Sequence, residues 1–154
     1  MTEPRIRRAT AADLPALVTM LADDALGRTR EDASLPVVQC YVDAFDAIEL
    51  DPNQSLAVVE MDGQCVGCLQ LSFIPGLSRL GMWRGQIESV RIAASHRGHG
   101  LGGQMIRWAI AQSRERGCGL VQLTTDKSRA DAKTFYESLG FESTHDGMKL
   151  ALHH

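Results

Sequence analysis

The stretch Arg97-Gly98-His99-Gly100-Leu101-Gly102-Gly103 decides how the fold of this chain is interpreted. Its four glycines free the backbone to curl, so that several N–H groups can converge on one oxygen-rich anion. A strand-like run, 86–93, precedes it, and an amphipathic helical run follows from Leu101, directing the positive end of its dipole at the same point. Arg97 adds a cation suited to phosphate oxygens. The stretch therefore predicts a phosphate or pyrophosphate site, although a tight turn between strand and helix would have the same composition.

Two familiar phosphate loops do not fit this stretch. No Gly-Lys-Ser/Thr follows it, so the signature of P-loop nucleotide hydrolases is absent. The glycines at 98, 100, 102 and 103 do not have Gly-x-Gly-x-x-Gly spacing, and the motif lies far from the first strand, where a dinucleotide-binding Rossmann fold would carry it. The phosphate site, if present, belongs to another class of protein.

Length and composition predict one ordinary globular domain. The 154 residues suit a single domain spanning 1–154, with 44% hydrophobic and 23% charged residues. A net charge of -3 argues against a nucleic-acid partner, and no apolar run approaches the roughly 20 residues that span a bilayer. The first five residues lack the apolar core of a signal peptide, so we expect a cytoplasmic protein with no membrane partner.

The four cysteines predict neither a metal site nor a disulfide. Cys65 and Cys68 form a C-x-x-C pair inside a strand-like run, where an odd spacing places side chains on opposite faces. We expect them to be buried small hydrophobic residues of a reduced protein. No grouping of His, Asp and Glu has metal-ligand spacing.

Hydrophobic periodicity predicts the α/β fold class, an α+β mixed sheet flanked by helices. A capping box, Thr10-x-x-Asp13, opens the first helix, and Asp62-Gly63 forms a hairpin turn. Strands are expected at 6–9, 56–61, 65–73, 82–93 and 120–125, helices at 10–21, 36–50, 101–117 and 130–139, a loop at 74–81, and a last pair of short strands at 141–143 and 148–152.

Two motifs in the second half give the chain a family resemblance. They are Arg97-x-x-Gly100-x-Gly102 after a strand, and Ala132-x-x-Phe135-Tyr136-x-x-x-Gly140-Phe141 after a further helix and strand. In this order they resemble the GNAT superfamily of acetyl-CoA-dependent N-acetyltransferases, in detail over residues 83–141. The resemblance implies a GNAT-type acyl-CoA N-acyltransferase fold, with a central, mostly antiparallel sheet.

The resemblance also implies acetyl-CoA as the acyl donor. The residues expected at its pyrophosphate are Arg97, Gly98, His99, Gly100, Leu101, Gly102 and Gly103. In such proteins the strand before the loop separates from its neighbour and its backbone pairs with pantetheine. Here that edge is Val90, Arg91 and Ile92, and an amide near Val90 would polarise the acetyl carbonyl.

Glu88 is the candidate general base. An amine like that of lysine has a pKa near 10.4, and reaching its free base at pH 7 costs about 4.6 kcal/mol, so a base is useful. On a regular strand Glu88 shares a face with Val90 and Ile92, an apolar setting that would make it a stronger base. A bulge in this strand would change that geometry, and an ordinary polar residue at a sheet rim is the alternative.

Tyr136 is the candidate general acid, because a phenol can donate a proton to the departing CoA thiolate. A helix tyrosine packed beside Phe135 is the alternative. Many relatives carry asparagine where this chain has Arg129, which leaves the pantetheine contact on this helix in doubt. Arg129 and Lys133 would instead reach the CoA phosphates, unless they form a solvated helix face.

The predicted function is acetyl transfer to a primary amine of a small molecule by direct attack. A protein or peptide acetyltransferase and a non-catalytic acyl-CoA sensor are the alternatives, and a homodimer is a family-level expectation. The acceptor would be formed by 24–50 and 74–84. Asp23, Asp24, Glu31 and Asp32 hint at a cationic acceptor, although charged helix ends explain them equally well.

Overall fold

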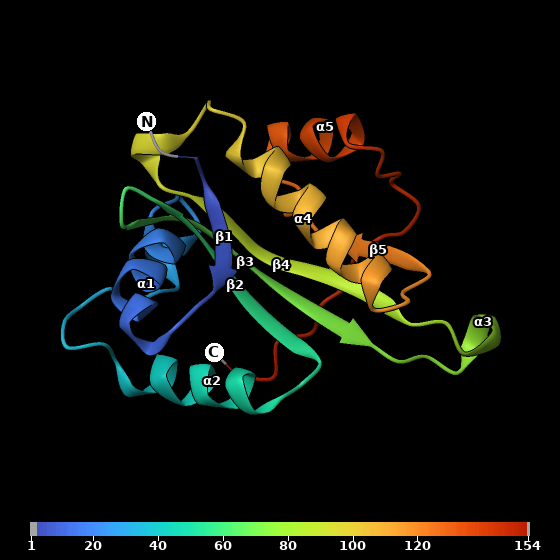
Figure 1. The fold of residues 1–154 in the computed structure, drawn as a ribbon, viewed down its shortest axis with the longest axis horizontal. Coiled ribbons are helices and arrows are strands. Elements are labelled where there is room, and N and C mark those ends of the chain that lie inside the picture. The colour runs from blue at the N-terminus through green and yellow to red at the C-terminus, as the bar shows by residue number, and fades with distance from the viewer. Residues whose placement is uncertain (1–2, 154) are drawn as a thin grey trace. The chain divides into compact units, whose positions relative to one another are not determined.

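The computed structural model describes residues 3–153, and its strands form one sheet in the order β1-β2-β3-β4-β5 (Figure 1). In chain order the elements are β1 (Arg5–Arg8), α1 (Leu14–Ala22), α2 (Gln39–Leu50), β2 (Gln54–Met61), β3 (Gln64–Ile74), α3 (Ser78–Gly81), β4 (Arg84–Ile92), α4 (Leu101–Glu115), β5 (Leu120–Leu123) and α5 (Ala130–Ser138), with single 3-10 turns η1 (Ala11–Asp13), η2 (Gly27–Thr29) and η3 (Ala94–His96). Strands β1 to β4 pair antiparallel. The predicted mixed sheet flanked by helices is confirmed. The chain divides into two compact units after Gln122, and each is described by itself.

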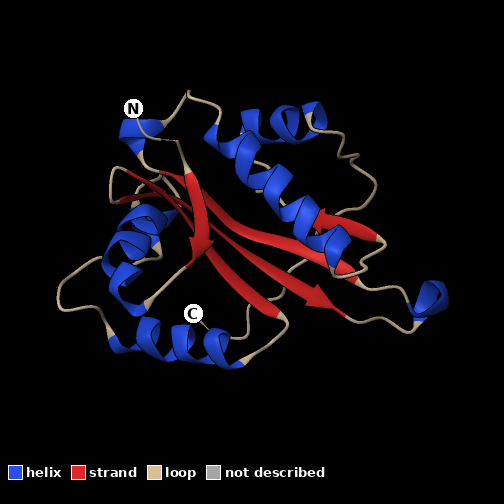
Figure 2. Cartoon of the chain, in the orientation of Figure 1, coloured by secondary structure: helices blue, strands red, loops and turns tan. Residues whose placement is uncertain are grey.

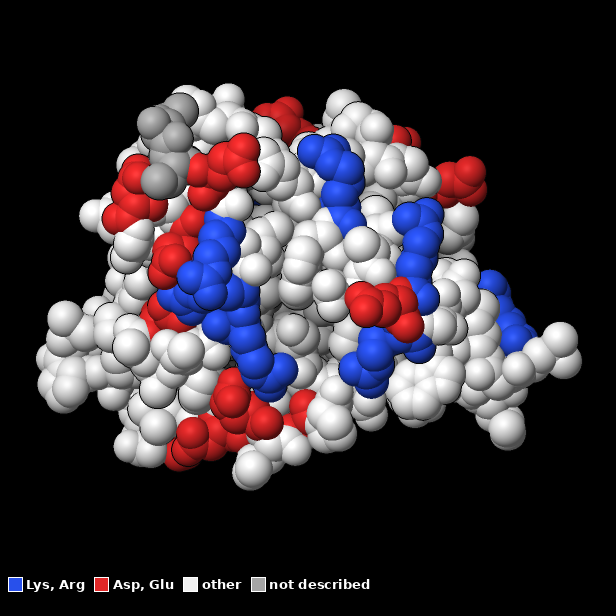
Figure 3. Space-filling view, viewed as in Figure 1, with Lys and Arg blue, Asp and Glu red and all other residues white. Residues whose placement is uncertain are grey.

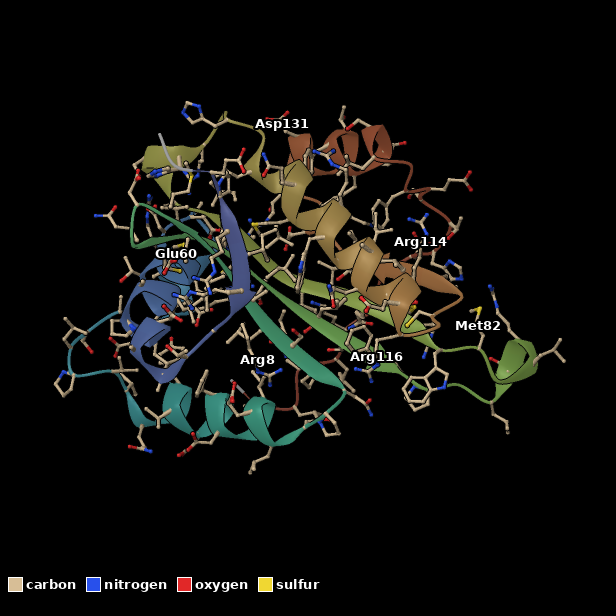
Figure 4. All side chains as sticks on the ribbon, viewed as in Figure 1. Arg8, Glu60, Met82, Arg114, Arg116 and Asp131 are labelled. Atoms are coloured by element: carbon tan, nitrogen blue, oxygen red, sulfur yellow. The ribbon has the colours of Figure 1, made fainter. Side chains whose placement is uncertain are left out.

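Alternation along β3 separates the two faces of the sheet. Cys68 belongs to a buried cluster with residues of α1 and α2, including Leu17 and Phe45. Phe73, of the opposite parity, has the guanidinium of Arg116 at the end of α4 lying 4.1 Å over its ring (Figure 4). The first unit therefore has α1 and α2 on one face of the sheet and α4 on the other.

A small residue in β4 allows α4 to pack closely. A Cβ at Gly85 would collide with the side chain of Ser113, which is itself buried on α4. The Ser113 hydroxyl donates to the carbonyl of Ala109 at 2.8 Å, so its burial leaves no unmet donor. This close approach fixes the helix that starts at the glycine-rich loop against the strand that precedes the loop.

An ion-pair network joins β1 to the start of α1. The Arg7 guanidinium donates to both Asp13 carboxylate oxygens, at 2.8 and 2.9 Å, and lies 3.3 Å from Glu60 on β2. The predicted capping box is confirmed, because the Thr10 amide donates to Asp13 at 2.7 Å. Figure 4 places Glu60 and Arg8 around β1, and Figure 3 shows basic and acidic side chains meeting there. The hydrogen bonds from Arg7 hold the pKa of Asp13 below its usual range.

The predicted last pair of strands is wrong. Within the described chain, residues 141–153 contain no strand, and Figure 2 draws the segment after α5 as loop. Met148, Leu150 and Leu152 alternate as predicted, but their side chains are 91%, 85% and 87% exposed. Alternation forms a strand only where a neighbouring strand supplies hydrogen-bond partners, and none is paired with this segment. The predicted helix at 36–50 begins at Gln39, and the strand at 120–125 ends at Leu123.

The cysteines are free, as predicted, but Cys65 and Cys68 do not diverge. Both pack against the cluster beneath α1, because the β2–β3 register shifts between Val59 and Glu60 and reverses the alternation. Burial raises the pKa of the Cys65 thiol to about 11 and that of Cys68 to about 12. Both therefore remain protonated core residues at neutral pH.

We predict that Asp13→Asn lowers the free energy of unfolding at pH 7 by about 2 kcal/mol, because a bidentate charged pair and a helix cap are weakened together. The folded-state pKa of Asp13 is depressed, so its contribution is present above the unfolded pKa and is lost as pH falls through the folded value. Urea unfolding of both proteins should show the difference shrinking below about pH 4. Asp46→Asn, an exposed position on α2, is the control, and an equal difference at pH 7 and pH 3 would contradict the assignment.

Candidate functional site

A β-bulge in β4 is the central feature of the candidate site. Cys68 faces Arg91 and Gln70 faces Glu88, so Leu69 alone opposes both Ser89 and Val90. Ser89 has a φ of 56°, in the left-handed region that residues with a side chain rarely adopt. The bulge reverses the alternation of the strand at the candidate general base.

The bulge overturns the expected surroundings of Glu88. Residues opposite each other in an antiparallel pair point to one face, so Glu88 lies on the face of Gln70 and Arg91 and not with Val90 and Ile92. The Glu88 side chain is exposed, and the expected apolar setting is wrong. The candidate base is therefore placed among polar groups on the face covered by α1 and α2.

Two glutamines orient the Glu88 carboxylate. The side-chain amide of Gln86 donates to Glu88 Oε1 at 2.6 Å, and that of Gln122 on β5 donates to the Gln86 carbonyl oxygen at 2.8 Å. Because Gln122 occupies the oxygen of Gln86, the NH₂ group of Gln86 is directed at Glu88. Sequence reasoning missed both residues. Gln86 lies two positions before Glu88 on the same strand, but spacing along one strand does not show which side chain of a neighbouring strand, here Gln122, it meets.

The last residues of β4 extend beyond β5. The Gly119 amide donates to the Trp83 carbonyl at 2.8 Å, and the Gln122–Gln86 bond has the same separation of 36 positions. At this offset Leu123, where β5 ends, lies level with Ile87. The backbone of residues 90–92, the predicted pantetheine edge, thus lies past the end of its neighbouring strand.

The glycine-rich loop has the backbone that the sequence predicts. Gly98 and Gly100 have φ values of 81° and 77°, and α4 begins at Leu101 immediately after Gly100. The amides of the first helical turn have no partner within a helix, and Gly102 and Gly103 carry no side chain to cover them. The backbone of this segment is therefore suited to an oxyanion such as the pyrophosphate of CoA. His99, within the segment, is exposed.

The arginines at the end of β4 pair with the end of α1. Arg97 donates to the Ile92 carbonyl at 3.1 Å and lies 3.6 Å from the carboxylate of Asp23. Arg91 lies 3.4 Å from the carboxylate of Asp24, and both side chains are largely buried. Two of the four acidic residues that hinted at a cationic acceptor, Asp23 and Asp24, are thus engaged by arginines of their own chain.

A cavity of about 140 Å³ lies between α1, α2 and the strands β2, β3 and β4. Its lining residues are Leu14, Leu17, Val18, Leu21, Tyr41, Ala44, Phe45, Ile48, Leu56, Cys68, Gln70 and Ser89. The Tyr41 hydroxyl donates to Glu31 at 2.9 Å and accepts from the Asp32 amide at 2.9 Å, and burial raises the pKa of the Tyr41 phenol. The sequence analysis expected an acceptor site formed by 24–50 and 74–84. Four of the twelve lining residues lie within 24–50 and none lies within 74–84, because the walls come from five separate elements.

The second unit carries the candidate acid. Tyr136 is half-buried on α5, with edge-to-face contacts to Phe135 and Phe141 at ring-centroid distances of 5.1 and 5.8 Å. Arg129 is the residue before α5, and Lys133 is exposed on that helix. Their roles toward CoA remain predictions.

A metal site and a membrane span each require a particular arrangement of residues. Among residues 3–153, no group of three His, Cys, Asp or Glu side chains is arranged to hold a metal ion. No helix in the same range is long and apolar enough to span a bilayer. His96 and His145 bond to the hydroxyls of their neighbours Ser95 and Thr144.

Fold and loop together define an α/β protein in which a bulged strand is followed by a glycine-rich loop and a helix N-terminus. Known proteins resemble this chain in sequence and in fold. The Acetyltransferase (GNAT) family matches residues 20–141. An aminoalkylphosphonate N-acetyltransferase of Salmonella typhimurium is 32% identical over 70% of this chain and 69% of that protein. A glucosamine 6-phosphate N-acetyltransferase of Trypanosoma brucei brucei is 37% identical over 58% of this chain and 59% of its own. A crystal structure described as a transcriptional regulator from Bacillus halodurans C-125 has a TM-score of 0.95 and 48% identity, covering 97% of this chain and all of that one.

The chain therefore belongs to the GNAT acetyltransferase family, and it is an acyltransferase. The resemblance found in the two sequence motifs is confirmed.

We predict that Gly100→Ala lowers the free energy of unfolding by about 1–2 kcal/mol, because alanine is strained in the left-handed region that position 100 adopts. Gly102→Ala, within the first turn of α4, is the matched control and should cost nothing, since alanine is the better helix former. Urea unfolding measures both. Equal stabilities of Gly100→Ala and the unchanged protein would show that the loop does not need its left-handed residue.

Proposed function

We propose that this protein transfers an acetyl group from acetyl-CoA to a primary amine of a small molecule, by direct attack of the amine. The observation that carries the proposal is the placement of Glu88. It lies at the bulge of β4, held by Gln86, on the strand that leads into the loop and helix suited to a pyrophosphate. The family supplies the reaction class.

The cofactor side of the proposed site is made mostly of backbone. Amides of residues 97–103 would bind the pyrophosphate, and those of residues 90–92 would pair with pantetheine as an added strand would. A single helix-end interaction contributes only about 0.3–1 kcal/mol at an exposed site, so several converging amides are needed. When bound, acetyl-CoA supplies the activated acetyl thioester.

The proposed chemistry needs the acceptor nitrogen deprotonated and the departing thiolate protonated. Glu88 accepts a proton from the acceptor's ammonium group, directly or through water, with its carboxylate aimed by Gln86. The neutral amine then attacks the thioester carbon, and the second proton of its nitrogen passes to solvent as the amide forms. An amide near Val90, freed from regular pairing by the bulge, stabilises the oxygen of the tetrahedral intermediate. Tyr136 protonates the departing thiolate.

A small-molecule acceptor is favoured over a peptide. The cavity beside Glu88 is bounded by two helices and the sheet, whereas a peptide acceptor needs an open groove. Two of the curated relatives are named for small amines, an aminoalkylphosphonate and glucosamine 6-phosphate.

A non-catalytic acyl-CoA sensor is the second candidate, since the structure from Bacillus halodurans is described as a transcriptional regulator. The two functions differ in turnover. A sensor binds acetyl-CoA without releasing CoA in the presence of any amine, and it is indifferent to Glu88→Gln and Tyr136→Phe.

We predict that Glu88→Gln lowers kcat by about 10²–10⁴-fold, because the amide cannot accept the proton of the amine. The KM for acetyl-CoA should stay within about twofold, since the proposed cofactor contacts are backbone amides. Release of free CoA thiol with a panel of primary amines is the measurement, and Glu115→Gln, exposed on α4, is the control. Unchanged turnover in Glu88→Gln would remove Glu88 as the base.

We predict that Gln86→Met lowers kcat about tenfold, because a hydrogen bond to a charged group contributes about 1.5–3 kcal/mol to placing it. Gln122→Met, which only frees Gln86 to rotate, should have a smaller effect. If the two act as one chain on Glu88, the double variant is no slower than Gln86→Met alone. Additive losses in kcat, or a loss confined to thermal stability, would contradict this positioning role.

A further inference from the structure

The cavity between α1, α2 and the sheet lies next to the candidate base. Gln70 and Ser89 belong to its lining, and they are respectively the cross-strand partner and the chain neighbour of Glu88. An amine whose nitrogen reaches Glu88 would therefore direct its remaining atoms among the cavity walls. The position of the cavity links it to acceptor binding.

The walls present carbon to an occupant. Most of the lining consists of aliphatic and aromatic side chains of α1 and α2. Two of the polar lining groups are already engaged: the Tyr41 hydroxyl bonds to Glu31, and the Gln70 amide donates to Gln54 at 2.9 Å. Burial of an occupant's apolar surface in such a cavity is favourable, whereas a hydroxyl group placed there would find few hydrogen-bond partners.

The cavity also lacks a cation. No Lys or Arg lines it, and four arginines of β1, β4 and the following loop are paired within the chain. Those pairs are Arg7 with Asp13 and Glu60, Arg8 with Glu49, Arg91 with Asp24, and Arg97 with Asp23. Arg84, at the start of β4, lies outside the lining. A phosphate or phosphonate placed in the cavity would be buried without a counter-charge, which is costly.

Two carboxylates next to residues of the cavity lining have the charge that suits an ammonium group. Glu88 is exposed beside the cavity, and Glu31 bonds to the Tyr41 hydroxyl of its wall. Arg28 and Arg30, at η2, are exposed and are not part of the lining. A carboxylate outside and carbon inside match a primary ammonium group on an apolar body.

We propose that the acceptor is a primary amine with an apolar body, an alkylamine or arylalkylamine, that occupies this cavity. The inference rests on the proposed acetyl transfer and deepens it. It separates this chain from the two relatives named for acceptors that carry a phosphonate or a phosphate.

A homologous series of acceptors tests the proposal. With acetyl-CoA saturating, kcat/KM is measured for n-propylamine to n-hexylamine, phenethylamine, 3-aminopropylphosphonate and glucosamine 6-phosphate. Each added methylene should raise kcat/KM by about fourfold until the cavity is full. The best alkylamine should exceed 3-aminopropylphosphonate by at least about tenfold.

A matched pair of variants on α2 assigns the effect to the cavity. Ala44 lines it and Ala47 does not, although both are exposed on the same helix. Ala44→Phe should raise the KM of the best alkylamine by about tenfold with the KM for acetyl-CoA unchanged, whereas Ala47→Phe should change neither.

The outcomes separate the two proposals. A preference for the phosphonate or phosphate acceptor, or a flat alkyl series unaffected by Ala44→Phe, would overturn the apolar acceptor while acetyl transfer stands. No CoA release with any amine, despite acetyl-CoA binding, would overturn the proposed function itself.

Discussion

The candidate site depends on the extra residue in β4. Because Ser89 and Val90 together oppose Leu69, the strand reverses its alternation between Glu88 and Arg91 and places both side chains on the face of α1 and α2. On an unbroken strand these two residues, three apart, would point to opposite faces. The same irregularity leaves backbone amides outside the regular ladder where the proposed acyl group would lie. The base and the proposed oxyanion donor therefore share one structural cause.

The position of Arg91 after the bulge connects α1, which lines the proposed acceptor cavity, to the strand that leads into the proposed pyrophosphate site. Arg91 pairs with Asp24, which attaches the end of α1 to the last residues of β4. Arg97 pairs with Asp23, which attaches the same end of α1 to the glycine-rich loop. The Asp24 pair is largely buried, so losing one partner would leave a poorly solvated charge. A helix that walls the cavity is thus held by residues adjoining the proposed pyrophosphate site.

How much the sequence reveals depends on the range of the interactions. The capping box Thr10–Asp13 and the left-handed Gly100 before α4 are set by residues within one turn, and both are predictable. The bulge is not, because it depends on how 68–70 pairs with 88–91, about twenty residues away. The prediction of a strand at 148–152 is wrong for the same reason. Its apolar residues alternate, but no strand of the described chain pairs with this segment. The relay from Gln122 through Gln86 joins two strands with a helix between them in the chain.

The two sides of the site use different parts of the chain, and this bears on what a family match means. Backbone amides after Ile92 and at the start of α4 depend on conformation, so a few glycines preserve them in distant relatives. The proposed acceptor cavity is lined mostly by side chains of α1 and α2, where each substitution alters shape and polarity directly. A relative 32% identical can therefore share the loop and the reaction and still differ in acceptor. For this chain the cavity walls, which lack any cation, argue for the acceptor more strongly than the names of its relatives do.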